Sequence, residues 1–201
     1  MTMRFAEQRY ELACSEPMHW LDKAREVRRA ADLVWDVSLA EANAFAAGAP
    51  LNGEPLFSSV ALMLYGFVIE NLLKAGLVAL GRGRTPGGRF DIKSHKLEDL
   101  ADQLTVQLDG EDRELLERLE AHLEWAGRYP IPLLVTDLAP RRFLDGSGHS
   151  IAGIISSLDR QRIDALIARI QTHLPSDDEA VGRVARRLSP TAEPVADNPA
   201  D

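Results

Sequence analysis

The chain has 201 residues, of which 45% are hydrophobic and 27% are charged, and its formal net charge is −8. These totals are typical of a soluble globular domain with a sizeable core, and they argue against a protein that coats nucleic acid with its whole surface. The single cysteine excludes an internal disulfide framework, and the charged N-terminus lacks the apolar core of a signal peptide, so we expect a cytoplasmic protein.

The first segment with a helical period runs from about Pro17 to Ala47. Its apolar residues recur at intervals of three and four, Pro17 suits the first turn of a helix, and Gly48 with Pro50 ends the run. The residues before Pro17, which include Cys14, are expected to form a loose terminus without a chemical role.

The second helix, from about Pro55 to Leu80, is apolar almost all round. Such a helix lies either at the centre of a bundle or in a membrane. Glu70, Asn71 and Lys74 interrupt the apolar run before it reaches the spanning length of about twenty residues. We therefore expect a buried central helix and no membrane span.

The next two helices are short and amphipathic. One begins near Ser94 with a single apolar stripe, and the other follows Asp109, which suits an N-cap. The latter places its leucines on one face and its carboxylates on the other, and it ends in "HLEWAGRYPIP", where two prolines forbid further helix. From Glu98 to Glu124 there are ten acidic residues and two arginines, so we expect a strongly acidic face here.

An irregular stretch from Tyr129 to about Ser156, with three prolines, precedes the last helix at about Leu158 to Leu174. Long connections of this kind are often functional. The sequence as a whole predicts an all-α fold: five helices in a largely up-and-down bundle, with a long irregular loop before the last helix. The domain is expected to cover residues 1–175, and residues 176–201 are expected to form a disordered tail.

The five histidines show no paired spacing, and there is no cluster of cysteine and histidine, so neither a metal nor another cofactor is predicted. The glycine-rich loop "RGRTPGGRFDIK" carries four basic residues and one aspartate. This loop is expected to attract phosphate, unless it is simply a solvated surface loop. Its basic residues are Arg82, Arg84, Arg89 and Lys93.

Glu70 interrupts an otherwise apolar helix, where an unpaired buried carboxylate would be costly. The sequence offers two possible partners for the Glu70 carboxylate. Lys74, four residues on, would form a pair at the surface. Alternatively, Arg128 would reach Glu70 across the bundle, with His95 close by. The second interpretation predicts a polar cluster at one end of the bundle that comprises Glu70, His95, Trp125, Arg128 and Tyr129.

Three stretches between Ser58 and Pro132, "YGFVIENLLKAGLVALG", "SHKLEDLADQL" and "WAGRYP", resemble the HEPN family of bacterial helical bundles. In that family a helix with a glutamate and "LKA"-like residues leads through a loop to a histidine-leucine helix start. The family includes RNA-cleaving toxins, defence components, nucleotide-binding modules and dimerisation partners. The resemblance implies a homodimer that binds a protein partner, RNA or a nucleotide, in a bacterial defence or toxin–antitoxin setting.

Nuclease members of the family carry an arginine, four to six further residues and then a histidine, near the start of a late helix. Such an enzyme needs a cation for the phosphate and an imidazole that moves a proton. Two pairs match the spacing: Arg89 with His95, between helices, and Arg142 with His149, in a glycine-bearing loop. The alternative function is therefore a metal-independent endoribonuclease that uses Arg142 and His149. A structural module without a ligand is a third possibility.

Overall fold

The structure is a computed structural model, and it describes residues 3–49, 58–85, 88–129, 141–142, 148–149 and 157–179. In these ranges the chain is all-α apart from two strands of two residues each. In chain order the elements are α1 (Met3–Ser15), α2 (Met18–Ala46), α3 (Ser58–Ala79), α4 (Leu97–Gln103), α5 (Gly110–Ala121), the π-helical segment η1 (His122–Ala126), β1 (Arg141–Arg142), β2 (Gly148–His149) and α6 (Ser157–Gln171).

Each of the five predicted helices is present, as α2 to α6, but the count of five is too low. The residues before Pro17 form α1 rather than a loose terminus, and Cys14 is buried within it. This helix contacts α2, α3 and the loop after α3. These contacts are tertiary, and the prediction of a loose terminus did not take them into account.

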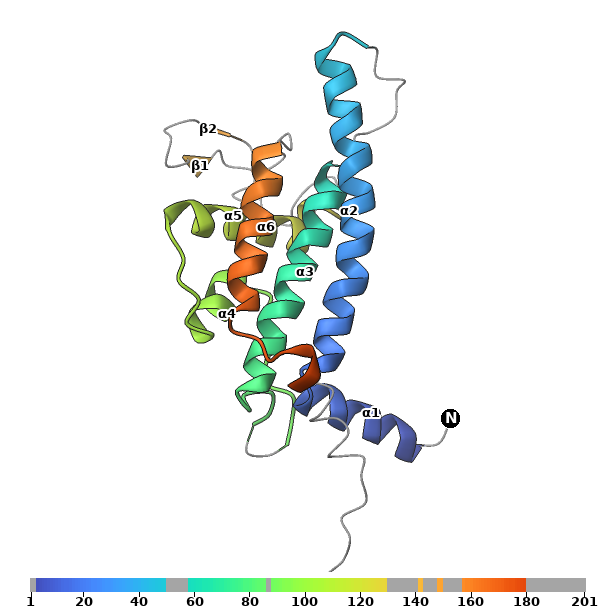
Figure 1. Cartoon of the computed structure of the whole chain (residues 1–201), viewed down its shortest axis with the longest axis vertical. Coiled ribbons are helices and arrows are strands. Elements are labelled where there is room, and N and C mark those ends of the chain that lie inside the picture. Colours follow the sequence, from blue (N-terminus) through green and yellow to red (C-terminus); the bar gives the residue numbers. More distant parts are fainter. Residues whose placement is uncertain are drawn as a thin grey trace, which may run out of the picture.

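Helix α3 lies at the centre, and α2, α4, α5, α6 and η1 all pack against it (Figure 1). Its burial extends around the whole helix, and most of its residues from Ala61 to Val78 are inaccessible to solvent. It is the one described helix long and apolar enough to cross a membrane, but 72% of its apolar window is buried inside the bundle. This burial agrees with the expected place of the helix at the centre of the bundle.

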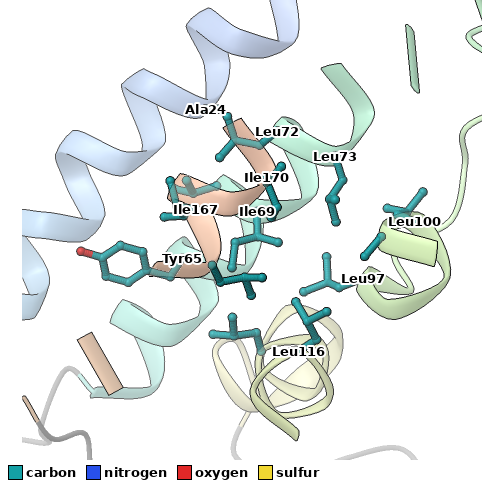
Figure 2. Packing of buried hydrophobic residues seen from close by; sticks show 14 of the residues in the cluster. Ala24, Tyr65, Ile69, Leu72, Leu73, Leu97, Leu100, Leu116, Ile167 and Ile170 are labelled. Carbon is teal, nitrogen blue, oxygen red and sulfur yellow. The ribbon is translucent and has the colours of Figure 1, made fainter. Parts of the chain in front are cut away.

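The core is formed by aliphatic side chains from every helix that surrounds α3. Leu97 and Leu100 of α4, Leu116 of α5 and Ile167 of α6 lie around the side chains of α3 (Figure 2). Each fully buried side chain of this size contributes about 1.5–3 kcal/mol relative to exposure. The apolar stripes of the short helices therefore determine which face each of them turns toward α3.

Gly66 of α3 allows the closest approach of α5 and η1. A Cβ atom at this position would lie 2.7 Å from Cγ of Leu123 and 3.2 Å from the carbonyl oxygen of Leu119. Gly76, two to three turns further on, faces only the flexible end of Leu104, with 2.6 Å from a Cβ atom to Cδ2. An added side chain at Gly66 would therefore meet backbone atoms, whereas one at Gly76 would meet only a side chain that can move.

A polar network at the side of the bundle joins α2, α3 and α6. The hydroxyl of buried Tyr65 donates to the carboxylate of Asp32, and the guanidinium of Arg160 lies 5.4 Å from the Tyr65 ring and 3.0 Å from Asp32. Arg160 and Arg28 both pair with Asp164. Burial, together with Asp32, raises the pKa of Tyr65. The network fixes α6 against the other two helices.

Most of the irregular stretch before α6, including "PLLVTDL", lies outside the described residues. In the described part β1 and β2 pair antiparallel, with Arg141 opposite His149 and Arg142 opposite Gly148. Of the expected tail, residues 176–179 are described: Ser176 accepts a hydrogen bond from the amide of Glu179, and Asp177 pairs with Arg25. The remaining tail, residues 180–201, lies outside the described residues.

Replacing Gly66 with alanine should destabilise the protein by about 1–3 kcal/mol, because the added methyl meets the backbone of α5. Gly76→Ala should be close to neutral, since the higher helix propensity of alanine offsets a contact that Leu104 relieves by moving. The free energy of urea unfolding of both variants provides the comparison. Equal losses for the two variants would contradict the close approach at Gly66.

Candidate functional site

The loop after α3, residues 81–96, is shaped by the end of that helix. The amide of Arg82 donates to the carbonyl of Leu77, and the amide of Gly81 donates to that of Val78, which is the hydrogen-bond pattern of a Schellman cap. Gly81 has a φ of +77°, which a residue with a side chain rarely adopts. The chain therefore reverses sharply, and the basic residues begin at once after the helix.

Helix α1 holds this loop in place. Arg84 and Phe90 form an antiparallel bridge, and the amide of Phe90 donates to the hydroxyl of Tyr10. The Phe90 ring stacks on Trp20 of α2 at 5.4 Å between centroids. A Cβ atom on Gly83 would lie only 2.0 Å from the carbonyl oxygen of Cys14, so only glycine allows this approach. The loop is thus a packed hairpin along its described length.

The four predicted basic residues of the loop differ in their surroundings. The guanidinium of Arg84 pairs with Glu11 of α1, and Arg82 donates to the carbonyl of Gln103 at 2.7 Å. Arg89 and Lys93 are exposed, and neither forms an ion pair with another residue in the described ranges. The loop therefore exposes three cations to solvent, Arg82, Arg89 and Lys93, and two of its cations, Arg82 and Arg84, line a hollow.

Two cavities adjoin Arg84. One of about 360 Å³ lies between the loop and the carboxyl end of α4, and one of about 350 Å³ lies between the loop and α1. The first is lined by Gly81, Arg82, Arg84, Asp91, Ile92, Ser94, Leu100 and Gln103. The second is lined by Glu11, Cys14, Ser15, Val78, Gly81 and Arg84.

Glu70 of α3 is buried and has two partners, Lys74 and His95. The ammonium of Lys74, also buried, lies 2.7 Å from Oε1 of Glu70 and 5.7 Å from the ring of Trp20. Nδ1 of His95 lies 3.1 Å from both carboxylate oxygens, whereas 63% of the His95 side chain is exposed. We refer to Glu70, Lys74 and His95 as the His95 cluster.

The backbone around His95 is fixed by helix α5 and η1. The ammonium of Lys96 bridges Glu120 and Glu124, and its hydrogen bond to Glu124 raises the pKa of Lys96. Glu120 also accepts a hydrogen bond from the amide of Leu97, the first residue of α4. The imidazole is therefore held at Nδ1 by Glu70, and Glu120 holds the two residues that follow it, Lys96 and Leu97.

This geometry assigns the roles of the two imidazole nitrogens. A carboxylate accepts the proton of Nδ1, so Nε2 is the ring nitrogen for which the described residues provide no hydrogen-bond partner, on a side chain that is largely exposed. When the ring is neutral, Nε2 accepts a proton or a hydrogen bond. When the ring is charged, Nε2 donates one. The arrangement is suited to binding an anionic oxygen or to moving a proton.

The predicted contact between Arg128 and Glu70 is wrong. Arg128 donates to the carbonyl oxygens of Leu123 and Glu124, and its guanidinium lies 5.6 Å from the ring of Tyr129. It satisfies carbonyls at the end of its own helix, which costs less than crossing the bundle. The alternative partner, Lys74, is confirmed, although the pair is buried and not at the surface as expected.

Trp125, Arg128 and Tyr129 do not join the His95 cluster. Trp125 lies in η1, where the amide of Gly127 donates to the carbonyl of His122 five residues earlier. Tyr129 is exposed. Of the predicted polar cluster the structure therefore brings together Glu70 and His95, and it places the other three residues at the end of η1.

The side chains of Arg142 and His149 lie outside the described residues. Their backbones belong to β1 and β2, and the residue opposite His149 in the register is Arg141 rather than Arg142. In the described residues Arg142 and His149 lie on strands rather than at the start of a helix.

Sequence reasoning missed Asp91, Ser94 and Gln103 as residues that surround a cavity with the arginines. It also missed Glu11 as the partner of Arg84. Of these residues, only Asp91 could have been noticed from the sequence, because it is the single acidic residue in the basic loop. The other three are ordinary polar residues in the sequence, and only the packing of α1 and α4 against the loop selects them.

His122 is completely buried at the start of η1. Its Nδ1 lies 2.8 Å from the carbonyl oxygen of Arg118, so it acts as the donor, while Nε2 has no hydrogen-bond partner in the described part of the chain. Burial lowers the pKa of His122 below its usual value. This histidine is therefore neutral in the folded protein near pH 7 and is closed to solvent.

Within the described ranges no group of three or more histidine, cysteine or acidic side chains has the arrangement of a metal site. Comparison with family models, with curated proteins and with solved structures finds no match for this chain. The resemblance to HEPN proteins remains a prediction from the sequence.

Lys74→Met should destabilise the protein by about 3–5 kcal/mol, because it leaves a buried carboxylate without its ammonium partner. The double variant Glu70→Gln, Lys74→Met should recover part of the loss. Arg128→Ala, which removes hydrogen bonds at a helix end, should cost only about 1 kcal/mol. Urea unfolding at neutral pH measures all three, and a cost below about 1 kcal/mol for Lys74→Met would show that the pair is not buried in solution.

His122 should make the protein sensitive to acid. The lowered pKa in the folded state means that the unfolded chain binds a proton first, so stability falls as the pH drops below about 6.5. The loss is limited to about 1.4 kcal/mol per pH unit and ends at the folded-state pKa. His122→Asn keeps a donor for the Arg118 carbonyl without titrating, and it should flatten this part of the curve of unfolding free energy against pH. His19→Asn, at an exposed histidine, is the control and should leave the slope unchanged.

Proposed function

We propose that this is a HEPN-like helical protein that acts by binding a phosphate-bearing ligand, RNA or a nucleotide, at the loop of residues 81–96. The observation that carries the proposal is the exposed imidazole of His95, which a buried carboxylate holds at Nδ1 at the end of a loop that carries four basic residues. Phosphate oxygens accept hydrogen bonds from imidazole and guanidinium groups, and these contacts supply most of the affinity for nucleic acid.

The charge distribution supports binding at this loop rather than over the whole surface. The segment from Glu98 to Glu124 has a strong negative charge, which repels phosphate. Its carboxylates are partly neutralised by Arg113, which pairs with Glu98 and Asp102, and by Lys96. The exposed cations Arg89 and Lys93 lie in the loop before that segment. An anionic ligand is thus expected to bind at the loop rather than at the acidic segment.

The proposed family assignment is supported by the residues on which the resemblance rests. Glu70 and Lys74 of the "ENLLKAG" stretch and His95 of the "SHKL" stretch are distant in the sequence but meet in one cluster. Their meeting gives a structural reason for that combination of residues. A homodimer, a cytoplasmic location, a protein partner and a role in bacterial defence or a toxin–antitoxin pair are parts of the proposal that rest on the resemblance alone.

A second candidate is a metal-independent endoribonuclease that uses Arg142 and His149. The pairing of β1 with β2 favours this candidate, because it brings the strand that contains Arg142 next to the strand that contains His149. RNA cleavage would be abolished in His149→Ala with the fold retained, whereas the binding proposal expects no effect of this substitution.

The binding proposal is tested by the fluorescence anisotropy of a labelled single-stranded RNA, with unlabelled nucleotides as competitors. His95→Ala should weaken binding about tenfold, and His19→Ala, at an exposed histidine of α2, should not. The double variant Arg89→Gln, Lys93→Gln should lower the slope of log affinity against log salt by about 1.4, since each lost phosphate contact contributes about 0.7 for a single strand. Absence of binding to both RNA and nucleotides in the unaltered protein would refute the proposal.

A further inference from the structure

The ring nitrogen Nε2 of His95 can act as a nucleophile as well as a hydrogen-bonding group. Nδ1 is committed to the Glu70 carboxylate, 63% of the side chain is exposed, and the described residues provide no hydrogen-bond partner for Nε2. We propose that His95 is a phosphoryl acceptor, whose Nε2 takes a phosphoryl group from a phosphoramidate, a class of donor that includes a phosphohistidine of another protein. This inference goes beyond the proposed function, because it needs neither RNA nor a nucleotide.

The Glu70 carboxylate prepares the imidazole for this reaction. Nδ1 lies 3.1 Å from both carboxylate oxygens, and an ionised carboxylate can only accept. In the neutral ring the proton is therefore on Nδ1 and the lone pair is on Nε2. A free imidazole exchanges between two tautomers, and both of its nitrogens can react. The contact with Glu70 makes Nε2 the nucleophile and increases its basicity.

The charges near the ring are compatible with an anionic donor. The ammonium of Lys74 lies 2.7 Å from Oε1 of Glu70, so the carboxylate that orients the ring is itself neutralised. Lys93 is exposed and precedes His95 by two residues, so their Cα atoms are at most about 7.6 Å apart, which is less than the Debye length of about 10 Å. The carboxylate that activates the imidazole therefore repels the phosphate oxygens of the donor only weakly.

The transfer step needs no other reactant. The lone pair of Nε2 forms a bond to phosphorus while the P–N bond of the donor breaks, and the electron pair of that bond leaves with the nitrogen of the donor. From phosphoramidate itself, whose nitrogen is protonated, the leaving group is ammonia. The imidazole ring then carries a positive charge, and Glu70 stabilises this charge through the proton that stays on Nδ1. One P–N bond replaces another.

Among the histidines whose side chains are described, His95 alone combines an oriented ring with exposure. His19 is exposed, and no hydrogen bond within the described ranges orients its ring. His122 has a comparable hydrogen bond from Nδ1, to the carbonyl oxygen of Arg118, but it is completely buried. These two histidines therefore separate the effect of exposure from the effect of orientation.

Potassium phosphoramidate is the probe, and it is incubated with the full-length protein. Phosphorus NMR distinguishes the Nδ1 and Nε2 isomers of phosphohistidine, and mass spectrometry of peptides prepared without acid locates the site. His95 should react about tenfold faster than His19, as expected from one charge-assisted hydrogen bond, and it should form the Nε2 isomer alone. His122 should not react. His95→Ala should remove the fast phase, and His19→Ala should leave it unchanged.

The double variant Glu70→Gln, Lys74→Met tests the positioning by Glu70. The two residues are changed together because a buried ammonium without its carboxylate would be costly, and circular dichroism verifies the fold. A neutral amide does not fix the proton on Nδ1, so His95 should lose its rate advantage and form both isomers. An unchanged rate and a single Nε2 isomer in the folded variant would contradict the role of Glu70.

Two results in the unaltered protein would overturn the inference. One is a His95 that reacts no faster than His19, and the other is the Nδ1 isomer at His95. No measurement in this series includes RNA, so its outcome is separate from that of the binding test. Phosphorylation of His95 without binding of RNA or nucleotides would reject the proposed function alone. Binding that depends on His95, without phosphorylation, would reject this inference alone.

Discussion

The buried ion pair of Glu70 and Lys74 constrains the structure more than any other polar interaction. Helix α3 is surrounded on all sides, so any charge on it must be neutralised within the bundle. The spacing of four residues solves this within one helix, without an arginine from elsewhere. The Glu70 carboxylate still has an oxygen that can accept a hydrogen bond from Nδ1 of His95. A structural necessity of the core therefore orients an imidazole at the surface.

Helix α1 connects the core to the loop. Tyr10, Glu11 and the carbonyl of Cys14 each contact a different point of residues 83–90. A glycine-rich stretch that would be mobile by itself becomes a hairpin with two cavities beside it. The same contacts reduce the positive charge that the loop offers, because Arg84 pairs with Glu11. The contact that helps to order the loop at Arg84 therefore also neutralises the charge of this residue.

Helix α5 and η1 hold the other side of the site. Glu120 binds both the Lys96 ammonium and the first amide of α4, so the residues after His95 begin a helix at a fixed place. The acidic segment that repels phosphate is the one that positions the imidazole. The π-helical turn that follows buries His122 and directs Arg128 to the carbonyls of its own helix. This turn ends α5. The positions of Trp125 and Tyr129 are determined by that helix end and not by contacts with the His95 cluster.

The sequence by itself determined the all-α class, the positions of α2 to α6 and the central place of α3, because helical periods and an apolar run are local properties. It also determined the cap of α5 at Asp109, since the reciprocal bonds with Asp112 span only three residues. It left open the partner of Glu70, because Lys74 and Arg128 are both cations that can pair with a carboxylate. Only their distances from Glu70 in the folded protein distinguish them. Helix α1, the burial of Cys14 and the grouping of Asp91, Ser94 and Gln103 were decided by the tertiary structure alone. Each of these depends on contacts between residues remote in the chain, and no local pattern records such contacts.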